Sequence, residues 1–319
     1  MFWYVGPLFQ LSLLVTVFTV NCTTTSKYAY EGDDKEFRLD TYEELRPYVF
    51  SKAPNISHFM KKGPYSFSVI KDFDIKVSKK ENVSADIYYS SHKQIAPLVI
   101  FQHGNLADKN SHRNQARMVA SWGMHAMIVS LPNKGRWMQN GKVLSKMVRL
   151  LHAWPELLEH SFDKNNIIVA GHSFGGSALA MAAGSRAPLK GAIFLDPALV
   201  DNKVKKYISK IEVPSVVIGA DKKVFRARQR KAFYKNLKSD VVEISIKDST
   251  HNDAQNPSLF SFPQMIGLEH GTSKEKQRKF TAAIIASAFS LASTGGNAYA
   301  WSAFQPAIKS GDIIQQKRK

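Results

Sequence analysis

A serine lies among glycines at residues 171–175, in the order Gly-His-Ser-Phe-Gly. This order fits the G-x-S-x-G pattern, in which a sharp turn between a strand and a helix holds the serine hydroxyl above a sheet edge. The glycines make such a turn possible, because side chains two residues before and after the serine would collide. A short apolar run precedes the turn at 167–170, and an alanine-rich run follows at 177–183. The pattern therefore predicts that Ser173 is a nucleophile.

A serine hydroxyl needs a base to take its proton, and the base needs an acid to orient it. Of the 10 histidines, His251 follows the last strand that we predict before the closing helix, at 241–248. Two acids also end predicted strands, Asp196 and Asp221. Either acid satisfies the chain order serine, acid, histidine. We therefore predict His251 as the base, and these patterns alone leave Asp196 and Asp221 both open as its acid.

Strands and helices that could position these residues alternate along the chain. An apolar or β-branched pattern predicts strands, and an amphipathic or alanine-rich pattern predicts helices. The expected strands are 97–104, 124–132, 167–170, 191–197, 215–221 and 241–248, after a hairpin at 65–77 and 82–90, and the expected helices are 112–123, 141–158, 177–183, 226–237 and 276–292. This alternation predicts an α/β fold with a mostly parallel central sheet, helices on both faces and the site at the carboxyl ends of the strands.

The composition is that of an ordinary globular protein, with 44% hydrophobic and 22% charged residues among 319. Cys22 is the one cysteine, which argues against an internal disulfide, a cysteine nucleophile and a metal site built from several thiolates. Acyl transfer from an ester to water through a serine needs no metal and no cofactor. We expect neither.

The two ends of the chain differ from its middle. Residues 2–20 are mostly apolar and uncharged, which is typical of a signal peptide or an N-terminal anchor over 1–22, and Cys22 adds the option of a lipoprotein. We predict an N-terminal extension at 23–63, the main domain at 64–292 and a loose basic C-terminal tail at 293–319. The location predicted from these features is an exported one, in the periplasm, secreted or anchored to a membrane.

The net charge is +18, and eight cations without an acid lie between Lys222 and Lys238. Such a surface favours an anionic lipid or polymer, although a solvated helix face explains it equally well. No aromatic-interleaved or finger-like motif accompanies the charge, so we expect no specific binding of nucleic acid. We expect a monomer.

Five stretches together resemble the α/β-hydrolase superfamily: "HGN" at 103–105, "GHSFGG" at 171–176, "LDP" at 195–197, "VPSVVIGAD" at 213–221 and "STHND" at 249–253. The resemblance covers roughly 65–292 and is nearest to the branch of cutinase-like polyester hydrolases, platelet-activating-factor acetylhydrolases and chlorophyllases. It implies an α/β-hydrolase fold and a serine hydrolase that cleaves carboxylic esters. A binding protein without catalysis, or a thioesterase, acyltransferase or peptidase, is the alternative on this fold.

The resemblance also implies roles for single residues. In the cutinase-like enzymes the acid stands two residues after the Asp of "GAD", where this chain has Lys223. In the acetylhydrolase and chlorophyllase patterns the acid ends the previous strand, which favours Asp196 and keeps Asp221 as the alternative. The oxyanion hole would consist of the backbone N–H groups of Phe174 and Asn105.

The substrate is less well defined by the sequence. The segment 198–214 is too short for a large lid, so an open site for small, polymeric or membrane-presented esters is expected. Four apolar side chains are candidates for the wall of an acyl pocket. They are Trp137, Phe260, Phe262 and Met265.

Overall fold

The structure is a computed structural model, and it describes residues 56–92, 95–133, 135–158, 160, 162–221, 229–258, 273–293 and 297–319. The predicted signal peptide or anchor at 1–22, with Cys22, lies outside the described residues. So does most of the predicted extension at 23–63.

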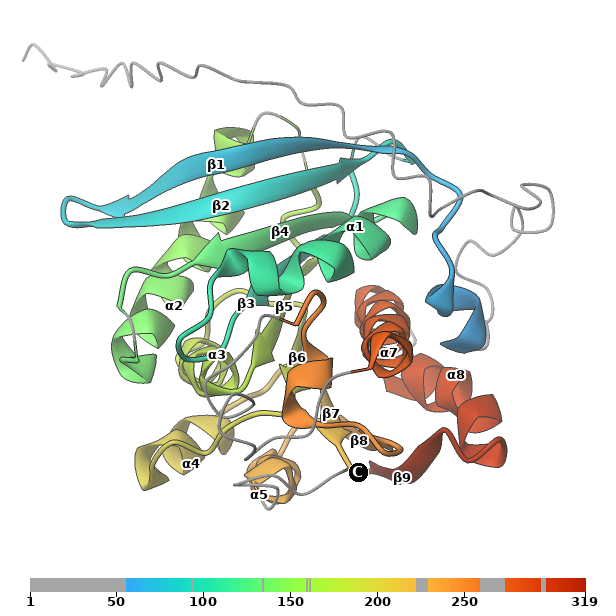
Figure 1. Ribbon diagram of the computed structural model, residues 1–319. Coiled ribbons are helices and arrows are strands. Elements are labelled where there is room, and N and C mark those ends of the chain that lie inside the picture. The colour runs from blue at the N-terminus through green and yellow to red at the C-terminus, as the bar shows by residue number, and fades with distance from the viewer. Residues whose placement is uncertain are drawn as a thin grey trace, which may run out of the picture.

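The described strands form one sheet in the order β1-β2-β4-β3-β5-β6-β7-β8-β9 (Figure 1). The pairs from β4 through β3, β5, β6 and β7 to β8 are parallel, and the outer pairs β1–β2, β2–β4 and β8–β9 are antiparallel. The strands are β1 Phe67–Ser78, β2 Glu81–Ser90, β3 Leu98–Gln102, β4 His125–Ser130, β5 Ile167–His172, β6 Gly191–Leu195, β7 Ser215–Ala220, β8 Val241–Ile246 and β9 Ile313–Arg318. The predicted α/β class with a mostly parallel sheet is confirmed.

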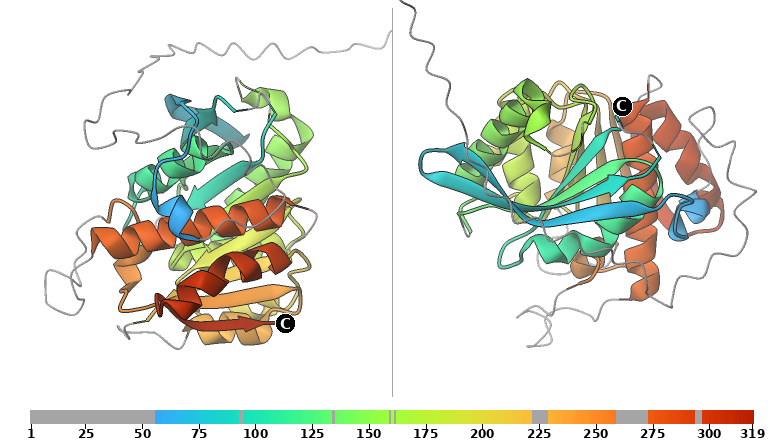
Figure 2. Two further views of the ribbon diagram at one scale, coloured as in Figure 1. Left: turned by 90° about the vertical axis from the view of Figure 1, so that its right-hand side faces the viewer. Right: turned by 90° about the horizontal axis from the view of Figure 1, so that it is seen from above.

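Helices cover both faces of this sheet (Figure 2). One apolar core lies between the sheet and α1, α7 and α8, and a second lies between the sheet and α2, α3, α4 and α5. The helices are α1 Arg113–Ser121, α2 Trp137–Ala153, α3 Phe174–Gly184, α4 Asn202–Ile208, α5 Gln229–Asn236, α7 Lys274–Ala292 and α8 Asn297–Lys309, with single 3₁₀ turns at η1 Ile56–Met60, η2 Lys109–His112, η3 Pro155–Leu157 and η4 His251–Ala254.

The central strands β3, β5, β6, β7 and β8 are buried at every position and mostly apolar, because both of their faces are covered. In β3, Val99 and Phe101 belong to the first core, and Leu98 and Ile100 belong to the second. Alternate side chains of a strand point to opposite faces, so one short run contributes to both cores. Residues 198–214, where no large lid was expected, hold only the short helix α4.

The prediction of a loose C-terminal tail is wrong. Helix α8 packs against α7, and β9 pairs with β8 in antiparallel register from Arg318 opposite Val242 to Ile313 opposite Ile246. Phe304 of α8 is fully buried, so this segment is part of the fold. The sequence "IIQQKR" does not predict a strand, because an edge strand with one solvated face carries few apolar residues.

The predicted start of the main domain at 64 is also too late. The turn η1 places Phe59, which is 1% exposed, against the rings of Trp122 and Phe289, with centroids 4.8 Å and 5.5 Å away. Aromatic contacts of this kind stabilise a core beyond the area that they bury. Residues 56–63 therefore belong to the domain and not to an extension.

Candidate active site

Ser173 stands at the turn between β5 and α3, with a backbone φ of 53°. A positive φ is strained for a residue with a side chain, and the surrounding structure must impose it. Here the Ser173 N–H donates to the carbonyl of Leu195 (3.1 Å), and the Ser173 carbonyl accepts from the N–H groups of Gly176 and Ala198 (both 2.9 Å). The end of β6 and the loop after it therefore hold the serine in place.

The glycines around Ser173 are required by close contacts of the backbone. A Cβ on Gly171 would lie 2.6 Å from the carbonyl oxygen of Gly175. A Cβ on Gly175 would lie 2.5 Å from the carbonyl oxygens of Gln102 and His103 at the end of β3. The motif thus lets the turn press against the neighbouring strand, as the sequence pattern predicts.

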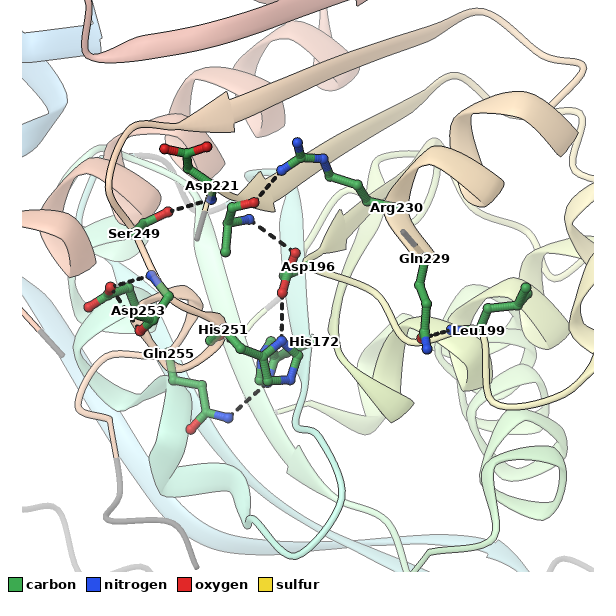
Figure 3. Close-up of polar contacts among 12 residues, drawn as sticks. His172, Asp196, Leu199, Asp221, Gln229, Arg230, Ser249, His251, Asp253 and Gln255 are labelled. Atoms are coloured by element: carbon green, nitrogen blue, oxygen red, sulfur yellow. Dashed lines mark hydrogen bonds and ion pairs between the residues drawn. The ribbon is translucent and has the colours of Figure 1, made fainter. Parts of the chain in front are cut away.

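His251 and Asp196 are in contact. The Nδ1 of His251, at the start of η4 after β8, lies 2.6 Å from Oδ2 of Asp196, at the end of β6 (Figure 3). The second carboxylate oxygen of Asp196 accepts from the N–H of Ala220 at 3.0 Å. A carboxylate can only accept, so the neutral imidazole carries its proton on Nδ1 and presents the lone pair of Nε2.

Asp221 faces elsewhere. Its Oδ2 accepts from the N–H of Asp248 at 3.1 Å, and its N–H donates to the hydroxyl of Ser249 at 3.3 Å. Figure 3 shows its carboxylate turned away from His251. Of the two acids that follow strands, Asp196 contacts the imidazole of His251. Asp221, which follows β7, instead contacts the turn after β8.

A second histidine, His172, supports the backbone of His251. The side-chain amide of Gln255 donates to Nδ1 of His172 at 2.8 Å, so His172 carries its proton on Nε2 and donates it to the carbonyl of His251 at 3.1 Å. Burial lowers the pKa of His172 well below its usual value, which keeps the ring neutral as this pattern requires. Gln255 carried no signal in the sequence, since a lone glutamine after the histidine fits no motif.

The 3₁₀ turn of His251 is also held from the N-terminal end of α1. Gln115 donates to the carbonyl of Ala254 at 3.0 Å and accepts from Nδ1 of His112 at 2.5 Å. Burial lowers the pKa of His112 to about 4, so this ring is neutral at pH 7. The loop that carries His251 therefore rests on buried, uncharged hydrogen-bonding groups.

The predicted oxyanion residues line one cavity of about 280 Å³, together with Gly104 and Gly175. Phe174 is the first residue of α3, and Asn105 is exposed on the loop after β3. Gly104 brings this loop against the serine, because a Cβ there would lie 3.1 Å from Cβ of Ser173. The cavity therefore lies next to Ser173, between the residues that flank it.

A buried ion pair anchors the far end of the same loop. The ammonium of Lys109 contacts the carboxylates of Asp86 and, at 2.6 Å, Asp72, and the N–H of Lys109 donates to the hydroxyl of Ser130 at 3.1 Å. Burial disfavours the charge of Lys109, but its hydrogen bonds to the two acids raise its pKa. The loop with Asn105 is thus tied to the β1–β2 hairpin and to β4.

The predicted pocket residues divide into two groups. Trp137 is buried at the start of α2, lines the cavity, and donates its indole N–H to Oδ2 of Asp201 at 3.2 Å. Leu131 and Ala178 extend the apolar lining, and Arg136 adds a cation at the exposed side. Phe260, Phe262 and Met265 lie outside the described residues.

A comparison with known protein families finds a match. Residues 133–292, about half of the chain, match the family described as platelet-activating factor acetylhydrolase, isoform II. The chain belongs to this family. Acetylhydrolases of this family are carboxylic ester hydrolases on the α/β-hydrolase fold, so the predicted branch and enzyme class are confirmed. No curated protein matches the chain.

The acetylhydrolase match includes Ser173, both candidate acids and His251, and it leaves out Asn105 and the C-terminal α8 and β9. Among the described residues, no helix is both long enough and apolar enough to span a bilayer. Within the same residues, no three histidine, cysteine, aspartate or glutamate side chains cluster as metal ligands would.

Proposed function

We propose that the protein is a serine hydrolase that cleaves carboxylic esters through Ser173, His251 and Asp196. The observation that carries this proposal is the contact of His251 Nδ1 with Asp196 at 2.6 Å, next to a serine with the strained φ of a nucleophile turn. Three strand ends supply these residues, as expected for a site at the carboxyl edge of a parallel sheet.

The reaction follows from this geometry. Nε2 of His251 takes the proton of the Ser173 hydroxyl while its oxygen attacks the ester carbonyl, and Asp196 stabilises the imidazolium that forms. The backbone N–H groups of Phe174 and Asn105 hold the negative charge on the carbonyl oxygen. His251 then gives the proton to the leaving alcohol, and water hydrolyses the acyl-enzyme by the same route.

The size of the cavity and the family name favour a short acyl group. The cavity of about 280 Å³ is lined in part by the apolar side chains of Trp137, Leu131 and Phe174, and its small size suits an acetyl or other short acyl chain. The family is described by its action on platelet-activating factor, a phospholipid with an acetyl ester. We therefore propose short-chain acyl esters of phospholipids as the substrate class.

A labelling experiment tests the nucleophile. A fluorophosphonate should react with the folded protein, and peptide mapping should find the adduct on Ser173, because the probe needs a hydroxyl activated by a base. A panel of p-nitrophenyl esters from acetate to laurate should show the highest kcat/KM for acetate. Thioester and amide substrates, and added alcohols as acyl acceptors, test the alternative activities and should give lower rates than the ester hydrolysis. An unlabelled protein, or an adduct on another serine, would contradict the proposal.

We also propose that the enzyme meets its substrate at an anionic lipid surface through exposed lysines of α4 and α5. These two helices contact each other, and Asp201, which caps the N-terminus of α4, accepts a hydrogen bond from the Trp137 indole of the cavity. The basic surface therefore adjoins the site. It consists of Lys203, Lys205, Lys206, Lys231 and Lys235, all exposed.

Salt should weaken this attraction. Raising NaCl from about 0.05 M to about 0.5 M should lower the hydrolysis of esters in phosphatidylglycerol vesicles several-fold, because screening shortens the reach of surface charges. Changing Lys231 and Lys235 to Gln should weaken vesicle binding by about 1 kcal/mol per lysine. Vesicles of phosphatidylcholine alone are the control. Equal rates in both salts on the anionic vesicles would rule out the basic surface as a lipid contact.

A further inference from the structure

Arg230 differs from the other cations of its helix. Helix α5 belongs to the basic stretch of the sequence, yet Arg230 is only 8% exposed and points to the sheet (Figure 3). Its Nε lies 3.0 Å from Oε1 of Glu243, a fully buried residue in the middle of β8. Arg230 is therefore buried, although it belongs to a basic stretch that the sequence alone would place in solvent.

A buried ion pair does little for net stability, because removing two charges from water costs about as much as their attraction returns. The fold nevertheless makes room for this one. A Cβ on Gly219 would lie 2.2 Å from Cδ of Arg230, so the glycine near the end of β7 lets the side chain pass. The reason for burying an arginine here must therefore lie in the other groups that its guanidinium contacts.

The guanidinium also donates through Nη1 to the carbonyl of Ala220, the last residue of β7. The same peptide group is held from its other side, since the N–H of Asp221 donates to Ser249. Ala220 in turn donates its own N–H to Oδ1 of Asp196, at 3.0 Å. The buried arginine thus lies two hydrogen bonds away from the carboxylate that contacts His251.

We infer that Arg230 is a positioning residue that fixes Ala220, so that the Ala220 N–H aims the Asp196 carboxylate at His251. This inference rests on the proposed function. Asp196 has a positive φ of 34°, so its side-chain direction depends on such contacts and is not set by a relaxed backbone. Glu243 supplies the counter-charge to the guanidinium, with its Oε1 3.0 Å from Nε.

Changing Arg230 to Met should lower kcat on soluble p-nitrophenyl acetate by roughly 10- to 100-fold and leave KM within about twofold, because a small misplacement of a catalytic group acts on the transition state. In a plot of kcat/KM against pH, the rise on the acid side should also move to lower pH. A poorly aimed Asp196 stabilises the imidazolium less, so His251 loses its proton more easily. A merely structural role of Arg230 would not move this rise.

Two further variants complete the test. Arg149→Met is the matched control, because Arg149 also donates to backbone carbonyls, of Ser185 and Arg186, but at the exposed end of α3; it should keep the wild-type kcat and profile. Arg230→Met/Glu243→Met replaces the ion pair with apolar side chains, which cores often accept without loss of stability. It should fold, as circular dichroism would show, and remain as slow as the single variant.

A folded single or double variant with wild-type kcat and an unmoved rise on the acid side would overturn the role of Arg230. That outcome leaves the proposed function standing as long as the fluorophosphonate labels Ser173. A wild-type protein that is neither labelled nor active would instead remove the proposed function itself.

Discussion

Changing Ser173 to Ala should reduce kcat on p-nitrophenyl acetate by about 10⁴- to 10⁶-fold, because the variant has no oxygen that can form the acyl-enzyme. Alanine keeps the Cβ of serine, so the strain at a φ of 53° and the backbone contacts of the turn are unchanged. The thermal midpoint should therefore stay close to the wild-type value. Steady-state kinetics and a melting curve measure the two quantities on one preparation.

Ser185→Ala is the control for this variant. Ser185 lies at the C-terminal end of the same helix, α3, away from the strand ends that carry Asp196 and His251. Its replacement should leave kcat within about twofold, as is usual for changes outside a reacting group. If Ser173→Ala kept a tenth or more of the wild-type rate, another group would have to be the nucleophile.

Much of the fold could be predicted from short sequence patterns, because the local structure that they favour is the one that the folded protein keeps. The strands at the centre are short and mostly apolar runs, which is the pattern expected of strands covered on both faces. The glycines around Ser173 are recognisable in the sequence because only a residue without a side chain fits there: Gly171 lies against the backbone of α3, and Gly175 lies against the end of β3. At each of these two positions, one close backbone contact leaves no room for the side chain of any other residue.

Helix boundaries were less predictable where a glycine has a packing role. The sequence predicts a helix that starts at Gly141, but α2 begins at Trp137 and continues through Gly141. A Cβ at Gly141 would lie 2.7 Å from Cβ of Met181, so this glycine permits close packing of α2 on α3. A glycine in a helix is ambiguous in sequence because it breaks helices and also allows close helix contacts.

The choice between Asp196 and Asp221 could not be made from the strand pattern. Both acids follow parallel neighbouring strands, so their backbones reach the same edge of the sheet. Their side-chain directions differ because Asp196 takes a positive φ, and because Ser249 and Asp248 hold Asp221 at the turn after β8. These contacts join residues far apart in the chain, and no local spacing reports them.

Changing Asp196 to Asn should lower kcat by about 10⁴-fold. The N–H of Ala220 needs an acceptor, so the amide oxygen of the asparagine would remain on Ala220 and its NH₂ group would face His251. An NH₂ donor makes Nδ1 of His251 an acceptor, and the ring proton must then sit on Nε2. In that tautomer the imidazole cannot take the proton of Ser173. Steady-state kinetics on p-nitrophenyl acetate measures the loss.

Asp221→Asn is the matched control, because it makes the same change of charge and shape at the other acid. An amide oxygen can still accept from the N–H of Asp248, so kcat should stay within about threefold of wild type. A large loss in Asp221→Asn with a small one in Asp196→Asn would reverse the assignment of the acid. A carboxylate has two accepting oxygens, whereas an amide has only one. The large loss of kcat is therefore expected at Asp196, whose two oxygens accept from the Ala220 N–H and from the imidazole of His251 at the same time.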